Sequence, residues 1–253
     1  MQVARKLVAE FLGTLLLAAA VLGAGIMAQH LARDPALALL CDALATGGAL
    51  VAFLLMFGPI SGAHLNPVVT VVMAWTGDLT PRLAAGYVVV QLAGAILGAL
   101  LANAMFGIDA AMATTVRTGA PVLLAEGVAT FGLIGVVICV GRTRPESAPY
   151  AVAAYIVGAY WFTSSTSFAN PAITLGRAFT DTYGGIRLVD VPGFIAAEAA
   201  GGALGALAFC WLVPLGRPGA HLSSSNSSST STSMTSPSSA EAGRASSDAT
   251  SRR

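Results

Sequence analysis

Charged side chains are scarce in this sequence: they make up 10% of its 253 residues, whereas hydrophobic residues make up 55%. A soluble domain of this length carries about a quarter charged residues. The net charge is only +1 and the charges form no basic patch, so no nucleic-acid partner is expected. This composition, with a mean hydropathy of +0.75, predicts an integral membrane protein surrounded by the lipid bilayer.

Cysteine is scarce as well, and residue patterns typical of catalysis are missing. Cys41, Cys139 and Cys210 are odd in number and lie inside apolar runs, so a disulfide framework is not expected. They could form a thiol site for a soft metal or metalloid, but the pattern favours small buried side chains. No metal-ligand cluster or phosphate loop is present, and the serines of 164–167 have no triad partners. We therefore expect no metal, no cofactor and no enzymatic activity.

Long apolar runs dominate the chain instead. Six of them are long enough to cross a bilayer, which takes about 20 residues. They cover residues 7–28, 36–57, 83–106, 121–141, 148–166 and 192–214. The first follows Arg5 and Lys6 as a signal peptide would. It is longer than the apolar core of a cleavable signal, about 7–15 residues, so we expect it to be retained as a span.

Two shorter apolar runs, 67–76 and 171–180, each begin at the proline of an Asn-Pro pair. Asn favours the N-cap of a helix and Pro its first turn, so Asn66 and Asn170 predict helix starts. Such short re-entrant half-helices are tolerated only where protein or a water-filled cavity satisfies their backbone. At membrane depth, both would aim a positive helix end and an amide side chain at a common point. This arrangement indicates a passage for neutral polar molecules.

The order span, span, half-helix, span occurs twice. Residues 9–14 (AEFLGT) match residues 125–130 (AEGVAT), and residues 87–102 resemble residues 194–209. Three spans per half place the two halves in opposite orientations, which is an inverted repeat with its site near the midplane. The expected fold is therefore an all-α membrane protein with six transmembrane helices and two re-entrant half-helices.

Three regions are expected along the chain: a first repeat at 1–110, a second repeat at 111–217 and a tail at 218–253. The tail is rich in Ser and Thr and almost free of apolar residues, so we expect it to be disordered. With both termini inside, nine Lys and Arg residues lie on the inner side and four on the outer side, or six against four without the tail. This bias predicts that both termini are cytoplasmic.

In these features the chain resembles the major intrinsic protein family, the aquaporins and aquaglyceroporins. The resemblance covers about residues 5–215 and rests on the motifs AEF-x-GT, SGAHLNP, QLAGAILGA and the second NPA. It implies a homotetramer with one pore through each subunit. It also implies a multi-pass protein of the cell membrane, here a bacterial inner membrane.

The resemblance implies a central site as well. In the family the two motif asparagines, here Asn66 and Asn170, donate hydrogen bonds to the permeating molecule at the narrow centre. The first motif departs from the family pattern, because Val68 replaces the usual Ala; this alters packing where the half-helices abut but removes no donor. Asparagine caps without a pore are the alternative. The other motif residues are Pro67, Pro171 and Ala172.

An outer constriction sets selectivity in this family. Counted from the motifs without gaps, its four positions are Thr46, Gly158, Ser167 and Ile173. Water-selective members usually carry Arg at the last position, with an aromatic residue and a His among the others, so a wide, Arg-free ring is expected here. Such a ring is similar to that of the bacterial subgroup associated with arsenic-resistance loci, which conducts uncharged trihydroxy metalloids. Arg177, one turn beyond Ile173, either reaches back to the outer vestibule or is solvated or lipid-facing.

Three acidic residues and one histidine accompany the apolar runs. Glu10 and Glu126 occupy equivalent repeat positions, and the resemblance implies that they accept hydrogen bonds from the loops before the half-helices. An acid within a span also suggests a proton relay, and Glu198, where the family usually has Gln, is a third candidate. His64 could gate with pH or be a fixed loop residue.

Together these features predict a passive channel for small uncharged solutes. The solutes expected are glycerol-like polyols or trihydroxy metalloids such as arsenite, with water also passing. The alternative is an ion-coupled secondary transporter that uses Glu10, Glu126 and Glu198; it should saturate and respond to a proton gradient. A non-conducting membrane scaffold is a third class.

Overall fold

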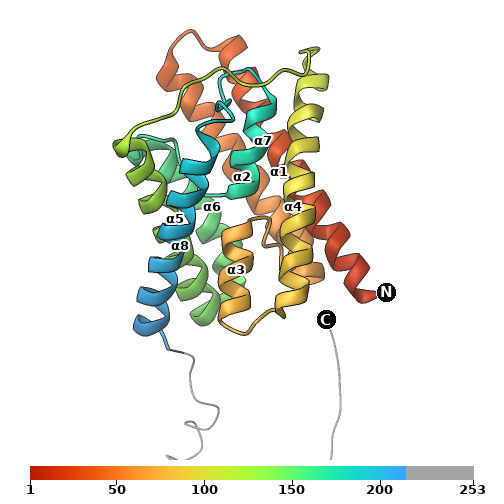
Figure 1. The fold of residues 1–253 in the computed structure, drawn as a ribbon, viewed down its shortest axis with the longest axis vertical. Coiled ribbons are helices and arrows are strands. Elements are labelled where there is room, and N and C mark those ends of the chain that lie inside the picture. Colours follow the sequence, from red (N-terminus) through yellow and green to blue (C-terminus); the bar gives the residue numbers. More distant parts are fainter. Residues whose placement is uncertain (215–253) are drawn as a thin grey trace, which may run out of the picture. The chain divides into compact units, whose positions relative to one another are not determined.

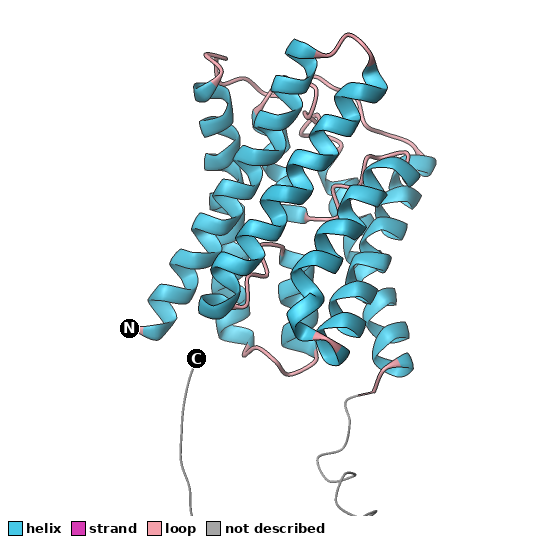
Figure 2. Cartoon of the chain, turned by 180° about the vertical axis from the view of Figure 1, so that it is seen from behind, coloured by secondary structure: helices cyan, strands magenta, loops and turns pink. Residues whose placement is uncertain are grey.

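The structure is a computed structural model and describes residues 1–214; the tail predicted at 218–253 lies outside these residues. All regular secondary structure in the described part is helical (Figure 2). The α-helices are α1 (Gln2–Leu31), α2 (Pro35–Ser61), α3 (Pro67–Trp75), α4 (Pro81–Met105), α5 (Ala120–Thr143), α6 (Ala148–Phe162), α7 (Pro171–Gly176) and α8 (Val191–Leu212). The 3-10 helices are η1 (Pro145–Ser147) and η2 (Arg177–Phe179).

Long helices form the body of a bundle (Figure 1). Within residues 1–214, five of them, α1, α2, α4, α5 and α8, have the length and apolarity needed to cross a membrane. Large apolar side chains are exposed on their surface, among them Val89, Leu124 and Trp211, as lipid contact requires. The prediction of a multi-pass membrane protein is confirmed.

The fifth predicted span, 148–166, is shorter in the structure. It corresponds to α6, whose 15 residues measure about 22 Å at a rise of about 1.5 Å per residue. The predicted boundary is wrong because the chain leaves the helix at Thr163, which is extended. Thr166 and Ser167 then adopt positive φ, which no helix tolerates. The short helix packs against α2 and α5.

The two half-helices begin where the Asn-Pro pairs predict. The first is α3, and the second is α7 continued by η2. They enter from opposite ends of the bundle and point toward each other at its centre (Figure 1). The order of elements from α1 to α4 recurs from α5 to α8, as the inverted repeat requires.

Small residues bring the first and last helix of each half into backbone contact. A Cβ on Gly98 of α4 would overlap the carbonyl of Leu15 in α1. At the equivalent place in the second half, a Cβ on Gly205 of α8 would lie 2.8 Å from the carbonyl oxygen of Phe131 in α5. In lipid such close packing holds helices together, because hydrophobicity does not drive their association.

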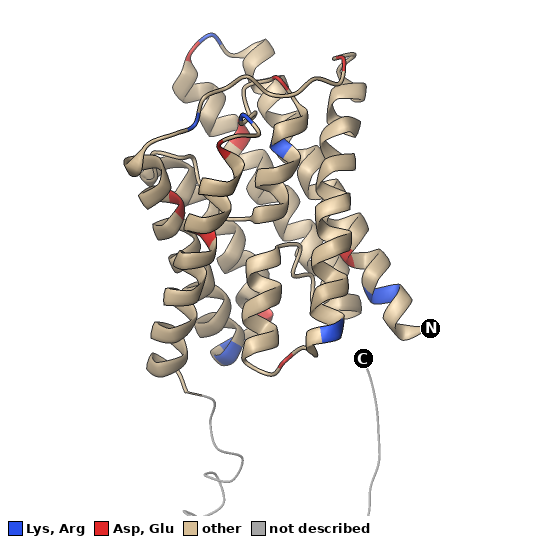
Figure 3. Ribbon diagram, in the orientation of Figure 1, with Lys and Arg blue, Asp and Glu red and all other residues tan. Residues whose placement is uncertain are grey.

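Charged residues gather toward the two ends of the bundle, with a few in its interior (Figure 3). Glu10, Glu126 and Glu198 are completely buried, and Asp42 and Arg177 are nearly so. Burying a charged group is costly unless hydrogen bonds replace its lost water. The partners of these side chains therefore identify the polar interior of the protein.

Candidate functional site

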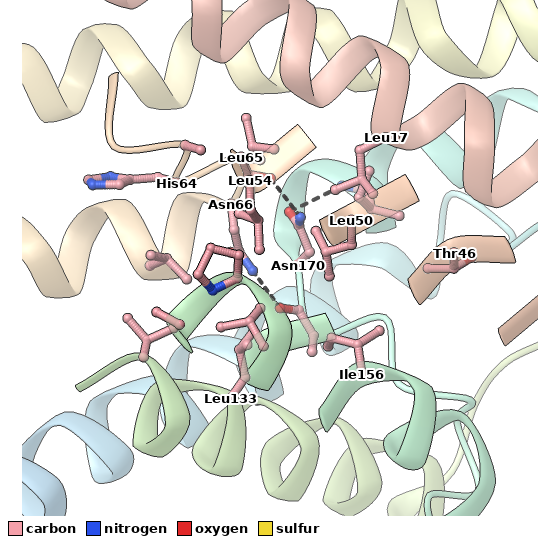
Figure 4. A pocket seen from close by; sticks show the side chains of 18 of the residues that line it. Leu17, Thr46, Leu50, Leu54, His64, Leu65, Asn66, Leu133, Ile156 and Asn170 are labelled. Atoms are coloured by element: carbon pink, nitrogen blue, oxygen red, sulfur yellow. Dashed lines mark hydrogen bonds between the residues drawn. The ribbon is translucent and has the colours of Figure 1, made fainter. Parts of the chain in front are cut away.

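A cavity of about 390 Å³ occupies the middle of the bundle. Its lining includes Thr46 and Arg177 toward one end, Gly141 and Pro145 toward the other, and the two motif asparagines between them. The lining is largely apolar around the asparagines. The apolar side chains there include Leu17, Leu50, Leu54, Leu133 and Ile156 (Figure 4).

Each motif asparagine caps its own half-helix. Asn66 Oδ1 accepts a hydrogen bond from the Val68 N–H at 2.9 Å, and Asn170 Oδ1 accepts one from the Ala172 N–H at 3.0 Å. This is the N-cap geometry that the Asn-Pro pairs predict. The positive ends of both half-helices consequently face the cavity.

The side-chain amides also cross from one half of the protein to the other. Asn66 Nδ2 donates to Ala169 O at 2.7 Å, and Asn170 Nδ2 donates to Leu65 O at 2.8 Å (Figure 4). Leu65 and Ala169 directly precede the asparagines and have positive φ of 49° and 46°, so both carbonyls stay outside helical hydrogen bonding. An amide nitrogen carries two N–H groups. Each asparagine therefore keeps one donor for a molecule in the cavity.

The buried glutamates bind the loops that lead into the half-helices. Glu10 accepts hydrogen bonds from the backbone N–H groups of His64 at 2.9 Å and Leu65 at 2.8 Å. Glu126 accepts from the equivalent groups of Phe168 at 2.9 Å and Ala169 at 2.7 Å. Both carboxyl groups thus sit where the resemblance implies structural acceptors.

The two halves differ at one buried position on their last helices, which is Gln91 in α4 and Glu198 in α8. Gln91 Nε2 donates to Glu10 Oε2 at 2.8 Å, which links the amide to the carboxylate in the first half. Glu198 takes the equivalent place in the second half, where its Oε1 accepts from Thr174 Oγ1 at 2.6 Å and from the Asn170 N–H at 3.2 Å. Glu198 Oε2 is buried and has no partner among the described residues.

Three of the four residues predicted for the outer constriction line the cavity: Thr46, Ser167 and Ile173. Gly158 is exposed on α6 and does not line the cavity, so it does not narrow the lumen. Positions two residues apart differ by about 200° around a helix, and Ile156 and Tyr160 face the lumen instead. The ungapped count is wrong here because the length of the loop between α6 and α7 sets the phase of α6.

Tyr160 is a lining residue that the motif count missed. Its hydroxyl lies 3.2 Å from Thr46 Oγ1, so the two side chains form one hydroxyl pair in the wall. An aromatic side chain therefore lines this part of the lumen beside the four positions from which a wide ring was predicted. The helical periodicity of α6 could have identified Tyr160 as a lining residue, because it lies one turn from Ile156 and on the face opposite Gly158.

Arg177 also reaches the lumen. Only 3% of its surface is exposed and it lines the cavity, so it is neither solvated nor lipid-facing. Its Nη1 donates to Gly184 O at 2.9 Å, and its Cζ lies 3.9 Å from the centroid of the Phe168 ring. Although Ile173 occupies the motif position of the ring, the arginine one turn further along lines the cavity, which agrees with the first of the two alternatives given for Arg177.

His64 lines the cavity on the opposite side of the asparagines from Thr46 (Figure 4). Its Nδ1 lies 3.2 Å from Thr70 Oγ1, and its ring makes an edge-on contact with Tyr87 at a centroid distance of 5.4 Å. These contacts fix the orientation of the ring, which favours the interpretation as a fixed loop residue.

A bundle in which two opposed half-helices present capped asparagines to an apolar lumen defines a membrane channel with an inverted repeat. The family model described as major intrinsic protein matches residues 1–167. The chain belongs to the major intrinsic protein family, whose members are channels and not enzymes.

Relatives and a solved structure agree with this family. The chain is 50% identical over 215 residues to aquaglyceroporin AqpS of Rhizobium meliloti. This match covers 85% of this chain and 92% of that protein. It is 30% identical over 242 residues to the probable aquaporin AqpM of Archaeoglobus fulgidus. This match covers 84% of this chain and 96% of that protein. The X-ray structure of the aquaglyceroporin from Plasmodium falciparum superposes with a TM-score of 0.64 at 20% identity, over 83% of this chain and 95% of that chain. This last likeness supports the aquaporin fold.

Proposed function

We propose that this protein is a passive channel for small uncharged solutes, with water and glycerol as its first candidates. The proposal depends on one observation about the two asparagine side chains in the lumen. Each amide donates one hydrogen bond to the opposite half of the protein and keeps a second N–H group for a solute. The names of the relatives, an aquaglyceroporin and a probable aquaporin, support the same class of solute.

The chemistry of the lumen favours neutral polar molecules over ions. A solute hydroxyl can accept the free N–H of Asn66 or Asn170 while its carbon atoms rest against apolar side chains such as Leu50. No carboxylate lines the cavity among the described residues, so a cation would lose its water without gaining a counter-charge. The positive ends of the two half-helices repel cations further.

Trihydroxy metalloids such as arsenite are a second class of solute in this proposal. Uncharged arsenite is a triol of about the size of glycerol, so the same amide and hydroxyl groups suit both molecules. Thr46, Ser167 and Ile173 would set the size limit together with Tyr160, which makes the lumen narrower than the four motif positions alone imply. Comparing glycerol and arsenite flux in the same vesicles assigns the preference.

Glu10 and Glu126 act as structural acceptors in this proposal. Their carboxylates are occupied by backbone N–H groups. Neither residue lines the cavity, whereas a proton relay must exchange protons with the lumen. These contacts favour the passive channel over the ion-coupled transporter.

We also propose a homotetramer in a bacterial inner membrane, with both termini cytoplasmic. The family resemblance supports the assembly, and the Lys and Arg bias supports the orientation. The loop after α1 and the loop after α4 lie at one end of the bundle, and the amino terminus lies at the other (Figure 1). The first end would then face outward.

Stopped-flow light scattering on proteoliposomes tests the proposal. Vesicles with the protein should equilibrate water and glycerol faster than empty vesicles, linearly with the solute gradient and independently of a proton gradient. Uptake that saturates and follows the proton gradient would indicate the transporter instead. Vesicles that behave like empty ones would indicate the scaffold.

A further inference from the structure

In the first half of the protein, four donors surround the buried carboxylate of Glu10. Ser61 Oγ donates to it at 2.6 Å, and the backbone N–H groups of His64 and Leu65 donate at 2.9 Å and 2.8 Å. The fourth donor is Gln91 Nε2, which lies 2.8 Å from Glu10 Oε2. A carboxylate has about four lone-pair positions, so the hydrogen-bonding capacity of Glu10 is filled.

In the second half, the loop supplies three equivalent donors to Glu126. The N–H groups of Phe168 and Ala169 donate at 2.9 Å and 2.7 Å, and Ser165 donates through its hydroxyl group. The residue at the repeat position of the α4 glutamine is Glu198 of α8. An ionised carboxylate only accepts hydrogen bonds. The fourth donor of Glu126 is therefore missing unless Glu198 carries a proton.

The carboxyl groups of Glu126 and Glu198 lie within hydrogen-bonding reach of each other, and both side chains are completely buried. Across residues 1–214, no Lys, Arg or His side chain lies within 4.0 Å of either carboxyl group. The other helices against α8, α3 and α7, contain no ionisable residue. Two ionised carboxylates in contact repel each other, and such a pair holds one proton instead.

The partners of each group indicate where this proton lies. The loop offers only donors to Glu126, so this group has to accept on both oxygens. Arg177 also interacts electrostatically with Glu126, from beyond 4.0 Å, which favours the ionised form there. Glu198 Oε1 accepts from Thr174 Oγ1 at 2.6 Å and from the Asn170 N–H at 3.2 Å. Its Oε2 is buried without a partner in the described part of the chain, so a proton on Oε2 completes both groups.

We propose that Glu198 is a protonated carboxylic acid that donates a hydrogen bond to Glu126 and thereby positions Asn170 in the lumen. Its Oε1 accepts from the backbone of Asn170 and from Thr174 of α7, and its Oε2–H joins both to α5. Asn170 offers its free amide N–H to the solute, so Glu198 acts through Asn170 as a positioning residue. The inference rests on the proposed channel function and deepens it.

The proton is held and not relayed in this arrangement. Neither Glu126 nor Glu198 lines the cavity, so the pair has no contact with water in the lumen. The pair therefore reproduces with a neutral acid the bond that an amide makes in the first half, where Gln91 donates to Glu10.

Infrared difference spectroscopy of the full chain in lipid at neutral pH tests the protonation. A protonated carboxyl group absorbs in a C=O region that is separate from that of a carboxylate. We expect Glu198→Gln to lose the band of one protonated carboxyl group per chain. The matched control is Glu146→Gln, because Glu146 is exposed in η1, and it should keep the band. A Glu198→Gln spectrum that retains the whole band would overturn the proposal.

Glycerol flux in proteoliposomes tests the positioning role. Glu198→Gln supplies an amide donor to Glu126 and keeps an acceptor for the Asn170 N–H, so its flux should stay within about twofold of the wild type. Glu198→Leu supplies neither, so its flux should fall by about tenfold, the effect of one lost hydrogen bond in a buried site. Equal flux in the two variants contradicts the positioning role, and so does a Glu198→Gln protein that no longer folds.

The infrared result decides the protonation even where Glu198→Leu does not fold, because it needs only the Glu198→Gln protein. It also separates this inference from the channel function. If the wild type conducts no solute but the band is lost in Glu198→Gln, the channel function fails and the protonated acid stands. If the wild type conducts and the band persists in the variant, the inference about Glu198 fails and the channel stands.

Discussion

Val68 and Gly202 form a complementary pair between α3 and α8. Both are buried, and a Cβ on Gly202 would overlap Cγ1 of Val68. The valine that departs from the family motif is therefore accommodated by the missing side chain on the facing helix. The Val68 side chain occupies the space that a side chain at position 202 would fill, and this close packing holds the first half-helix in place.

The first prediction follows from this pair. Gly202→Ala should overpack the contact, lower stability by about 1–3 kcal/mol and reduce glycerol flux, because α3 must shift. Adding Val68→Ala should restore both properties. Thermal unfolding in detergent and flux in vesicles measure the effect. Gly48→Ala is the matched control, since its new Cβ would meet nothing within 4 Å; an equal loss there, or no rescue by Val68→Ala, contradicts the prediction.

The second prediction concerns the crossed asparagines. Serine can cap a helix but is too short to reach the opposite half, so Asn66→Ser keeps the cap and loses the bond to Ala169 O. Asn170→Ser similarly loses the bond to Leu65 O. Each should lower glycerol flux by about tenfold or more, since a buried carbonyl and the solute both lose a donor. Vesicle flux at equal protein content measures this; a loss in only one of the two variants would contradict the equivalence of the halves.

The local sequence was sufficient to predict where the half-helices begin. It was not sufficient to predict which residues line the outer part of the lumen. The start of each half-helix depends on an Asn cap and a Pro first turn, which are properties of adjacent residues. The phase of α6 depends on the non-helical path around Thr166 and Ser167, so a count along the chain placed Gly158 in the lumen. The direction of Arg177 depends on Phe168 and on the Gly184 carbonyl, which only the folded loops bring to it.

The third prediction concerns Asp190, which precedes α8. It accepts hydrogen bonds from Arg187 Nε at 3.1 Å and from the Arg117 N–H at 2.9 Å. The bond from Arg187 is the main cause that lowers the pKa of Asp190 below its ordinary 3.8. A carboxyl group with a lowered pKa stabilises the fold above its unfolded pKa, and this contribution is lost as the pH falls through the folded value.

Protection of the loop around Arg117 should therefore be constant from neutral pH down to about pH 4 and should decline below that. Hydrogen exchange of residues 106–119, corrected for the intrinsic rate at each pH, measures it. Asp190→Asn should show lower protection at Arg117 and a weaker dependence on pH, while the bonds from Thr114 to Asp181 in the same loop still respond to pH. Wild-type protection that persists unchanged well below the ordinary pKa would contradict the role of Asp190.

The fourth prediction concerns Glu198 and separates the channel from the transporter. Gln91 already serves in the equivalent place of the first half, where its amide donates to Glu10. In Glu198→Gln, the side-chain oxygen can still accept from Thr174, and the new amide replaces the Oε2 that has no partner in the described part of the chain. Glycerol flux should therefore stay within about twofold of the wild type, and stability should not fall.

Glu126→Gln is the contrasting variant for this prediction. Its new amide would put a donor where the Phe168 and Ala169 N–H groups need acceptors, so stability should fall by about 1–3 kcal/mol. Thermal unfolding and vesicle flux with and without a proton gradient measure both variants. A passive channel with structural glutamates requires that Glu198→Gln conducts and that neither variant changes a response to the proton gradient. If Glu198→Gln abolished gradient-driven uptake while the protein stayed folded, the buried acids would be carrying protons.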